Sequence, residues 1–130
     1  PPSEAVGELA LGRLRELDAS RSTLFKLALV KLLGRFSDPR FTEPFGRLLG
    51  DPSSMVREAV LRAYRSRPLG RLLNRIVALT DDSVASVRHE AMRVLARSKD
   101  LRARRALEML MKRSNSVQER VLKQIIKASR

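Results

Sequence analysis

The sequence repeats itself with a period of about 31 residues, and no other feature constrains the fold as strongly. The segments that begin at Phe25, Val56, Val87 and Val117 align at offsets of 31, 31 and 30. Apolar residues also coincide four positions on (Leu29, Val60, Ala91, Val121) and eight positions on (Leu33, Tyr64, Leu95, Ile125). Steps of four and eight residues follow one face of a helix. The columns therefore predict a repeated helix whose apolar face forms a core.

A second set of apolar columns lies between these segments and follows the same shift. Its members are Phe41, Leu72 and Ala103, then Phe45, Ile76 and Leu107, then Leu48, Leu79 and Leu110. Asp38-Pro39 and Asp51-Pro52 are typical of helix starts, because an Asp side chain caps the N-terminus of a helix and Pro is tolerated in its first turn. Almost no segment alternates apolar and polar residues, so no strand is predicted. We expect an all-α chain of eight helices at 3–17, 21–36, 39–49, 52–66, 68–79, 83–98, 101–113 and 116–129.

Two of the repeats carry a charged motif at the same place. Asp51 is followed by Val56-Arg57, and Asp82 by Val87-Arg88. These residues resemble HEAT repeats of the short bacterial type, which also occur in phycobilin-lyase-like proteins. The resemblance covers about residues 21–130 and is strongest for the pairs that start near 52 and 83. In the outer repeats Ser20 with Lys26, and Lys112 with Gln118, replace the Asp and Arg.

The resemblance implies a right-handed α-solenoid of antiparallel helix pairs with about four repeats. It divides a single domain, 1–130, into a capping helix at 1–20, repeats at 21–50, 51–81 and 82–114, and a terminal helix at 115–130. In HEAT repeats the motif Asp and Arg stack between adjacent repeats as a ladder of charge-assisted hydrogen bonds. The resemblance thus implies a structural role for Asp51, Arg57, Asp82 and Arg88, and we do not count these four as a binding surface.

Positive charge is concentrated in the second half of the chain. The formal net charge is +13; residues 1–65 carry 11 basic and 8 acidic side chains, and residues 66–130 carry 16 and 6. Arg40, Arg71 and Arg102 recur at steps of 31 on the second helices of the pairs. A concave solenoid face focuses the field of like charges. We therefore predict a concave basic binding row made of Arg40, Arg71, Arg75, Arg102, Arg104 and Arg105. The alternative is that these arginines only solvate an exposed helix face.

Several function classes lack the residues they need. The chain has no Cys and one His, which excludes a disulfide framework, a thiolate zinc site and a His-based metal site. We see no Gly-rich phosphate loop and no nucleophile elbow, so we expect no enzyme, no cofactor and no small-molecule substrate. Alkylpurine DNA glycosylases are built from HEAT-like repeats, but they use aromatic residues in a basic groove, and this chain has no Trp and one Tyr.

The sequence favours a binding module. Its apolar runs are far shorter than the roughly 18 residues of a membrane span, and no signal or transit peptide is recognisable, so we expect a cytoplasmic protein without a transmembrane segment. The chain begins Pro1-Pro2 without Met, so we expect a processed product or a fragment of a longer protein. We expect a non-catalytic scaffold that binds an acidic protein surface or peptide. The alternative is sequence-nonspecific binding of DNA or RNA through the same basic face.

Overall fold

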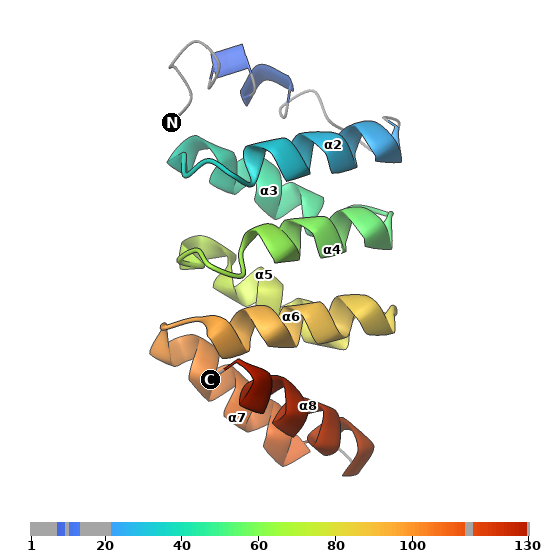
Figure 1. Cartoon of the computed structure of the whole chain (residues 1–130), viewed down its shortest axis with the longest axis vertical. Coiled ribbons are helices and arrows are strands. Elements are labelled where there is room, and N and C mark those ends of the chain that lie inside the picture. Colours follow the sequence, from blue (N-terminus) through green and yellow to red (C-terminus); the bar gives the residue numbers. More distant parts are fainter. Residues whose placement is uncertain (1–7, 10, 14–21, 114–115, 130) are drawn as a thin grey trace. The chain divides into compact units, whose positions relative to one another are not determined.

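Every regular element in the described part of the chain is a helix (Figure 1). The computed structural model describes residues 8–9, 11–13, 22–113 and 116–129. Its α-helices are α2 (Thr23–Leu33), α3 (Thr42–Leu48), α4 (Ser54–Ala63), α5 (Leu73–Ala78), α6 (Ala85–Arg97), α7 (Leu101–Arg113) and α8 (Ser116–Ala128). Three 3₁₀ helices join them: η1 (Pro39–Phe41), η2 (Gly70–Leu72) and η3 (Leu79–Asp81). The predicted all-α class is confirmed. The predicted helix 3–17 lies mostly outside the described residues, although 8–9 and 11–13 are helical.

The helix starts keep the period of the sequence. Helices α2, α4, α6 and α8 begin at Thr23, Ser54, Ala85 and Ser116, which are evenly spaced at the repeat period. The second helices follow the same step, since η1, η2 and α7 begin at Pro39, Gly70 and Leu101. The repeat that the apolar columns predict is therefore a repeated pair of helices joined by a turn.

Local capping explains where the helices differ from the predicted ranges. The side chain of Asp38 accepts a hydrogen bond from the Arg40 N–H, and the segment opens as the 3₁₀ helix η1 rather than as an α-helix. Asp51 accepts from the Ser53 N–H at 3.0 Å, so α4 begins two residues later than Pro52. A short Asp side chain that bonds two residues ahead holds a turn rather than a helix.

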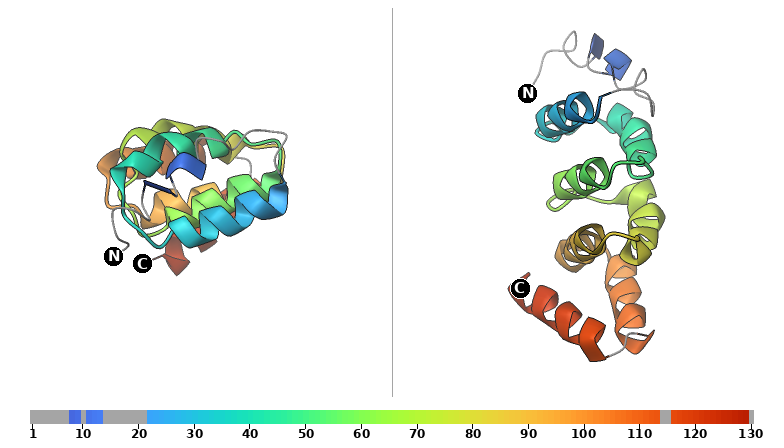
Figure 2. Two further views of the ribbon diagram at one scale, coloured as in Figure 1. Left: turned by 90° about the horizontal axis from the view of Figure 1, so that it is seen from above. Right: turned by 90° about the vertical axis from the view of Figure 1, so that its right-hand side faces the viewer.

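The chain divides into two compact units, Pro1–Ala63 and Tyr64–Arg130. In the first unit α2 packs against α4 in one layer, with α3 across from them (Figure 2). In the second unit α6 contacts α5, α7 and α8, and α5 contacts α7. The boundary falls at the end of α4, inside the predicted repeat 51–81, and the single repeat domain with its stated bounds stays a prediction.

The apolar columns form the core in both units. Buried members are Leu33, Phe41, Phe45, Leu48, Val56, Val60, Tyr64, Leu72, Ile76, Val87, Ala91, Leu95, Ala103, Leu107, Leu110 and Ile125. Phe25 breaks the pattern, because 47% of its surface is exposed. Helix α2 is the first helix of the continuous range 22–113, and its core partner is α4. A residue of an apolar column is fully buried only where its repeat packs against another repeat on each side.

Gly70, at the start of η2, has a φ of +51°, which L side chains rarely adopt. No atom lies within 4 Å of a Cβ built there, so the constraint is in the backbone alone. We expect Gly70→Ala to lower the free energy of unfolding by about 1 kcal/mol in urea denaturation. Gly50→Ala is the matched control: its Cβ would meet the Arg47 carbonyl at an ordinary 3.5 Å. Equal stability of the two variants would contradict the argument.

Candidate functional site

Two of the predicted binding arginines are tied to a local aspartate in the same way. Asp100 accepts from the Arg102 N–H at 2.8 Å and from the Arg102 Nη2 at 2.7 Å. Asp38 does the same for Arg40, at 2.9 Å from the N–H and 2.8 Å from Nη2. In each pair Nε also lies within 3.2 Å of the carboxylate. An Asp-x-Arg turn therefore opens both second helices and engages the arginine that follows.

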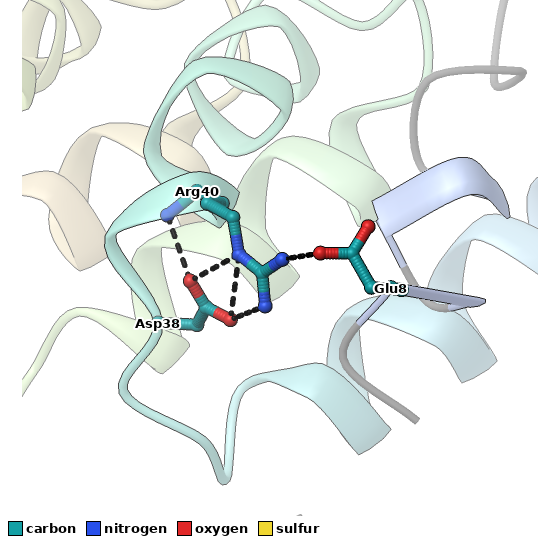
Figure 3. A network of polar contacts seen from close by, with 3 residues as sticks. All are labelled: Glu8, Asp38 and Arg40. Atoms are coloured by element: carbon teal, nitrogen blue, oxygen red, sulfur yellow. Dashed lines mark hydrogen bonds and ion pairs between the residues drawn. The ribbon is translucent and has the colours of Figure 1, made fainter. Parts of the chain in front are cut away.

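These pairs perturb the ionisation of their members. The hydrogen bonds from Arg102 lower the pKa of Asp100, and those from Asp100 raise the pKa of Arg102. The pKa values of Asp38 and Arg40 shift in the same directions for the same reason. Arg40 also donates to the carboxylate of Glu8 (Figure 3). Arg40 is thus held between two acidic groups of the first unit.

Arg71, the middle member of the predicted row, has a different environment. Leu69 occupies the place of the aspartate and is 3% exposed. Arg71 is exposed and makes no ion pair with any described residue. Three arginines that look equivalent in the sequence therefore differ in charge compensation.

The second unit gathers most of the predicted binding arginines on two adjacent helical segments. We call this set the arginine face: Arg71, Arg75, Arg102, Arg104 and Arg105, from η2, α5 and α7. All five are exposed. The α5 and α7 helices contact each other, so the set is carried by neighbouring helices. Arg40 lies in the first unit, and the continuous row that joins it to Arg71 stays a prediction.

Two hollows in the second unit meet at the turn 97–99. The turn pocket, about 700 Å³, lies between the turns at 65–70 and 97–102. Its lining residues are Arg65, Ser66, Arg67, Pro68, Leu69, Gly70, Arg97, Ser98, Lys99, Asp100 and Arg102. The helix groove, about 590 Å³, is lined by Leu95, Ala96, Arg97, Ser98, Lys99, Arg104, Leu107, Glu108, Met111, Ile126 and Ser129. The first hollow is lined mainly by polar side chains, and the second combines cations with aliphatic side chains.

The predicted ladder residues of the first unit, Asp51 and Arg57, both form hydrogen bonds. The Asp51 carboxylate is buried and accepts from the Nζ of Lys26 at 2.7 Å, across 25 residues of sequence. Arg57 Nη1 donates to the backbone carbonyl of Asp51 at 2.7 Å and to that of Pro52 at 3.2 Å. Lys26 stands one repeat before Arg57 and so occupies the motif Arg position of the preceding repeat. The Lys26–Asp51 pair is therefore a contact between the motif positions of successive repeats.

The same local geometry recurs in the second unit. Arg88 Nη1 donates to the backbone carbonyl of Asp82 at 2.8 Å, and the Asp82 carboxylate accepts from the Val84 N–H at 2.9 Å. Each motif arginine thus reaches back six residues to a backbone carbonyl, while each motif aspartate holds the turn that precedes its helix.

One buried carboxylate was not predicted from the sequence. Glu90 of α6 is 1% exposed and receives two bonds from Arg65, one of them from Nε at 3.0 Å and the other from Nη2. Arg65 lies in the turn that follows α4 within the second unit. The corresponding positions of the preceding repeat hold Gly34 and Ala59, so the periodicity gave no signal for the pair. The pair fastens the wall of the turn pocket to α6.

The described residues contain no group of three or more His, Cys, Asp or Glu side chains placed to hold a metal ion. None of the helices in the described ranges is long and apolar enough to cross a membrane. The chain matches no protein-family model and no curated protein sequence.

Proposed function

We propose that this chain is a non-catalytic binding module of HEAT-like repeats that holds an acidic segment of a partner protein on the arginine face. The observation that carries the proposal is the charge of the second unit: Arg71, Arg75, Arg104 and Arg105 are exposed and form no ion pair with described residues. A guanidinium offers a planar fork of donors that matches a carboxylate. A surface of this kind attracts Asp- and Glu-rich chains.

The helix groove favours a protein over a nucleic acid as the partner. Leu107, Met111 and Ile126 line it beside Arg104 and Lys99. Aliphatic side chains of a peptide bury surface against such a lining, and cations at the edge pair with neighbouring carboxylates. Proteins that bind single-stranded nucleic acids commonly stack the bases on exposed aromatic rings. Tyr64 is the one Phe, Tyr or Trp between residues 64 and 130, and it is 6% exposed.

Helix order supports the repeat part of the proposal. Helix pairs that start at the repeat period, and a buried cation–carboxylate contact between successive motif positions, are what a ladder-forming solenoid needs. Stacked pairs of this kind present their second helices on one side, where solenoids bind their partners. In a solenoid, the arginine face would therefore be the inner surface.

The test compares the full chain with the charge-reversed variant Arg71→Glu/Arg105→Glu. Proteins are captured from a nuclease-treated lysate of the source cell, and the captured protein is purified and titrated against both. We expect the variant to bind about 10-fold more weakly or worse, because two attractive charges become repulsive. Circular dichroism should show the same helix content, since both side chains are exposed.

The control variant is Lys31→Glu/Arg47→Glu, which reverses two exposed charges in the first unit. It changes the net charge equally and should bind the partner like the unaltered chain. Equal weakening by both variants would mean that overall charge, rather than the arginine face, attracts the partner. Capture that disappears on nuclease treatment would replace the proposal with nucleic-acid binding through the same face.

A further inference from the structure

The turn pocket gathers five positively charged side chains around one hollow. Four guanidinium groups and one ammonium group line it, from Arg65, Arg67, Arg97, Arg102 and Lys99. The lining carries a single carboxylate, that of Asp100. Like charges gathered around one hollow repel each other, so an arrangement of this kind is costly unless an anion occupies it.

Three of these charges have partners, and the other two form no ion pair within the described ranges. Arg65 is paired with Glu90, and Arg102 with Asp100. The Arg67 guanidinium lies over the Tyr64 ring, 5.6 Å from its centroid. Arg97 and Lys99 are exposed and form no ion pair with any residue in the described ranges. The uncompensated charge therefore sits on the last residue of α6, Arg97, and in the turn that follows, on Lys99.

The walls of the pocket are fixed by packing rather than left to move. Arg65 is held to the buried Glu90 of α6 through two hydrogen bonds, which fastens the 65–70 turn. The 97–102 turn joins α6 to α7, which contact each other, and Ser98 Oγ accepts from the Asp100 N–H at 3.1 Å. A preorganised set of donors loses little conformational freedom on binding an anion.

We propose that the turn pocket binds a compact small molecule that carries two or more phosphoryl groups. Phosphoryl oxygens accept the paired N–H groups of a guanidinium, and a dianion compensates Arg97 and Lys99 together. The volume of about 700 Å³ lies within the range of small-ligand sites. No aromatic ring lines the pocket, so recognition falls on the phosphoryl groups and not on a base.

The turn pocket shares residues with the surfaces of the proposed function: Arg97, Ser98 and Lys99 also line the helix groove, and Arg102 belongs to the arginine face. Arg71, Arg75 and Arg105 line neither hollow. The charge-reversed variant Arg71→Glu/Arg105→Glu therefore tests the arginine face without changing the lining of the turn pocket.

The test is calorimetric titration of the full chain with sodium tripolyphosphate at low salt. We expect one site per chain whose affinity falls as salt rises from about 50 to 200 mM, because the contacts are ionic. Arg97→Gln/Lys99→Gln should weaken binding by about 10-fold or more, from the loss of two charge-assisted contacts. The matched control, Arg47→Gln/Lys31→Gln, removes the same two side-chain types from exposed positions of the first unit and should leave the affinity unchanged.

Three results would overturn the proposal. The first is no binding of tripolyphosphate by the unaltered chain. The second is equal weakening by the pocket and control variants, which would show a diffuse attraction. In the third, a mixed-sequence RNA or a DNA duplex binds in a manner that depends on Arg97 and Lys99 while tripolyphosphate neither binds nor competes. Unchanged tripolyphosphate affinity in Arg71→Glu/Arg105→Glu would show that the pocket acts without the arginine face.

Discussion

Lys26→Met should lower the free energy of unfolding by about 3 kcal/mol, because it leaves a carboxylate buried without its cation. Lys26 is 2% exposed, and its Nζ lies 2.7 Å from the Asp51 carboxylate, whose side chain is 6% exposed. At this degree of burial, water does not replace the lost ammonium group of Lys26. The hydrogen bond that remains, from the Ser53 N–H, reaches only one of the two carboxylate oxygens of Asp51. Urea denaturation monitored by circular dichroism measures the change.

The double variant Lys26→Met/Asp51→Asn separates the charge from the packing. Asparagine keeps an oxygen for the Ser53 N–H and carries no charge, so the double variant should be more stable than Lys26→Met alone. A cost below about 1 kcal/mol for Lys26→Met would show that the pair is solvated and not a buried contact.

Arg65→Met should lower the free energy of unfolding by about 2 kcal/mol, because it removes the Nε and Nη2 donors of Arg65 from a buried carboxylate. Its partner, Glu90, is 1% exposed, and Arg65 supplies it with two hydrogen bonds. The expected cost is smaller than for Lys26 because the Arg65 side chain is 37% exposed and its charge is partly solvated. Thermal and urea unfolding of the variant, compared with the unaltered chain, give the measurement.

Arg62→Met is the matched control for Arg65→Met. Arg62 pairs with Glu58 at 2.5 Å one helical turn away, and its side chain is 58% exposed. Exposed pairs of this spacing contribute about 0.3 to 0.5 kcal/mol. Equal losses for the two variants would mean that burial of Glu90 adds nothing to its pairing energy.

The helical order of the chain was predictable because it depends on side-chain volume and periodicity alone. Sixteen residues of the apolar columns are buried, and the helices begin at the predicted step. Phe25 was placed in the same column and is exposed, since a column position is core only when a neighbouring repeat covers it. Periodicity identifies a face and does not identify what lies against it.

The candidate site was less predictable because charge compensation depends on one or two neighbouring residues. Arg40, Arg71 and Arg102 share a column, yet aspartates two residues earlier engage the first and third of them. That difference was visible in the sequence as Asp-x-Arg against Leu69-Gly70-Arg71. The Arg65–Glu90 pair and the convergence of two turns in the turn pocket had no periodic signal, so only the fold reveals them.

Because of the Lys26–Asp51 contact, we expect the repeat to tolerate inserted residues at some positions and not at others. Lys26 and Asp51 are 25 residues apart in the sequence, and both side chains are buried where they form their ion pair. An inserted residue near Asp51 would shift the carboxylate away from the ammonium and leave two dehydrated charges. The turn at 34–38 is exposed or half-exposed, and it can absorb extra residues without moving either group. Length variation among related chains should therefore collect in that turn and spare the stretch around Asp51.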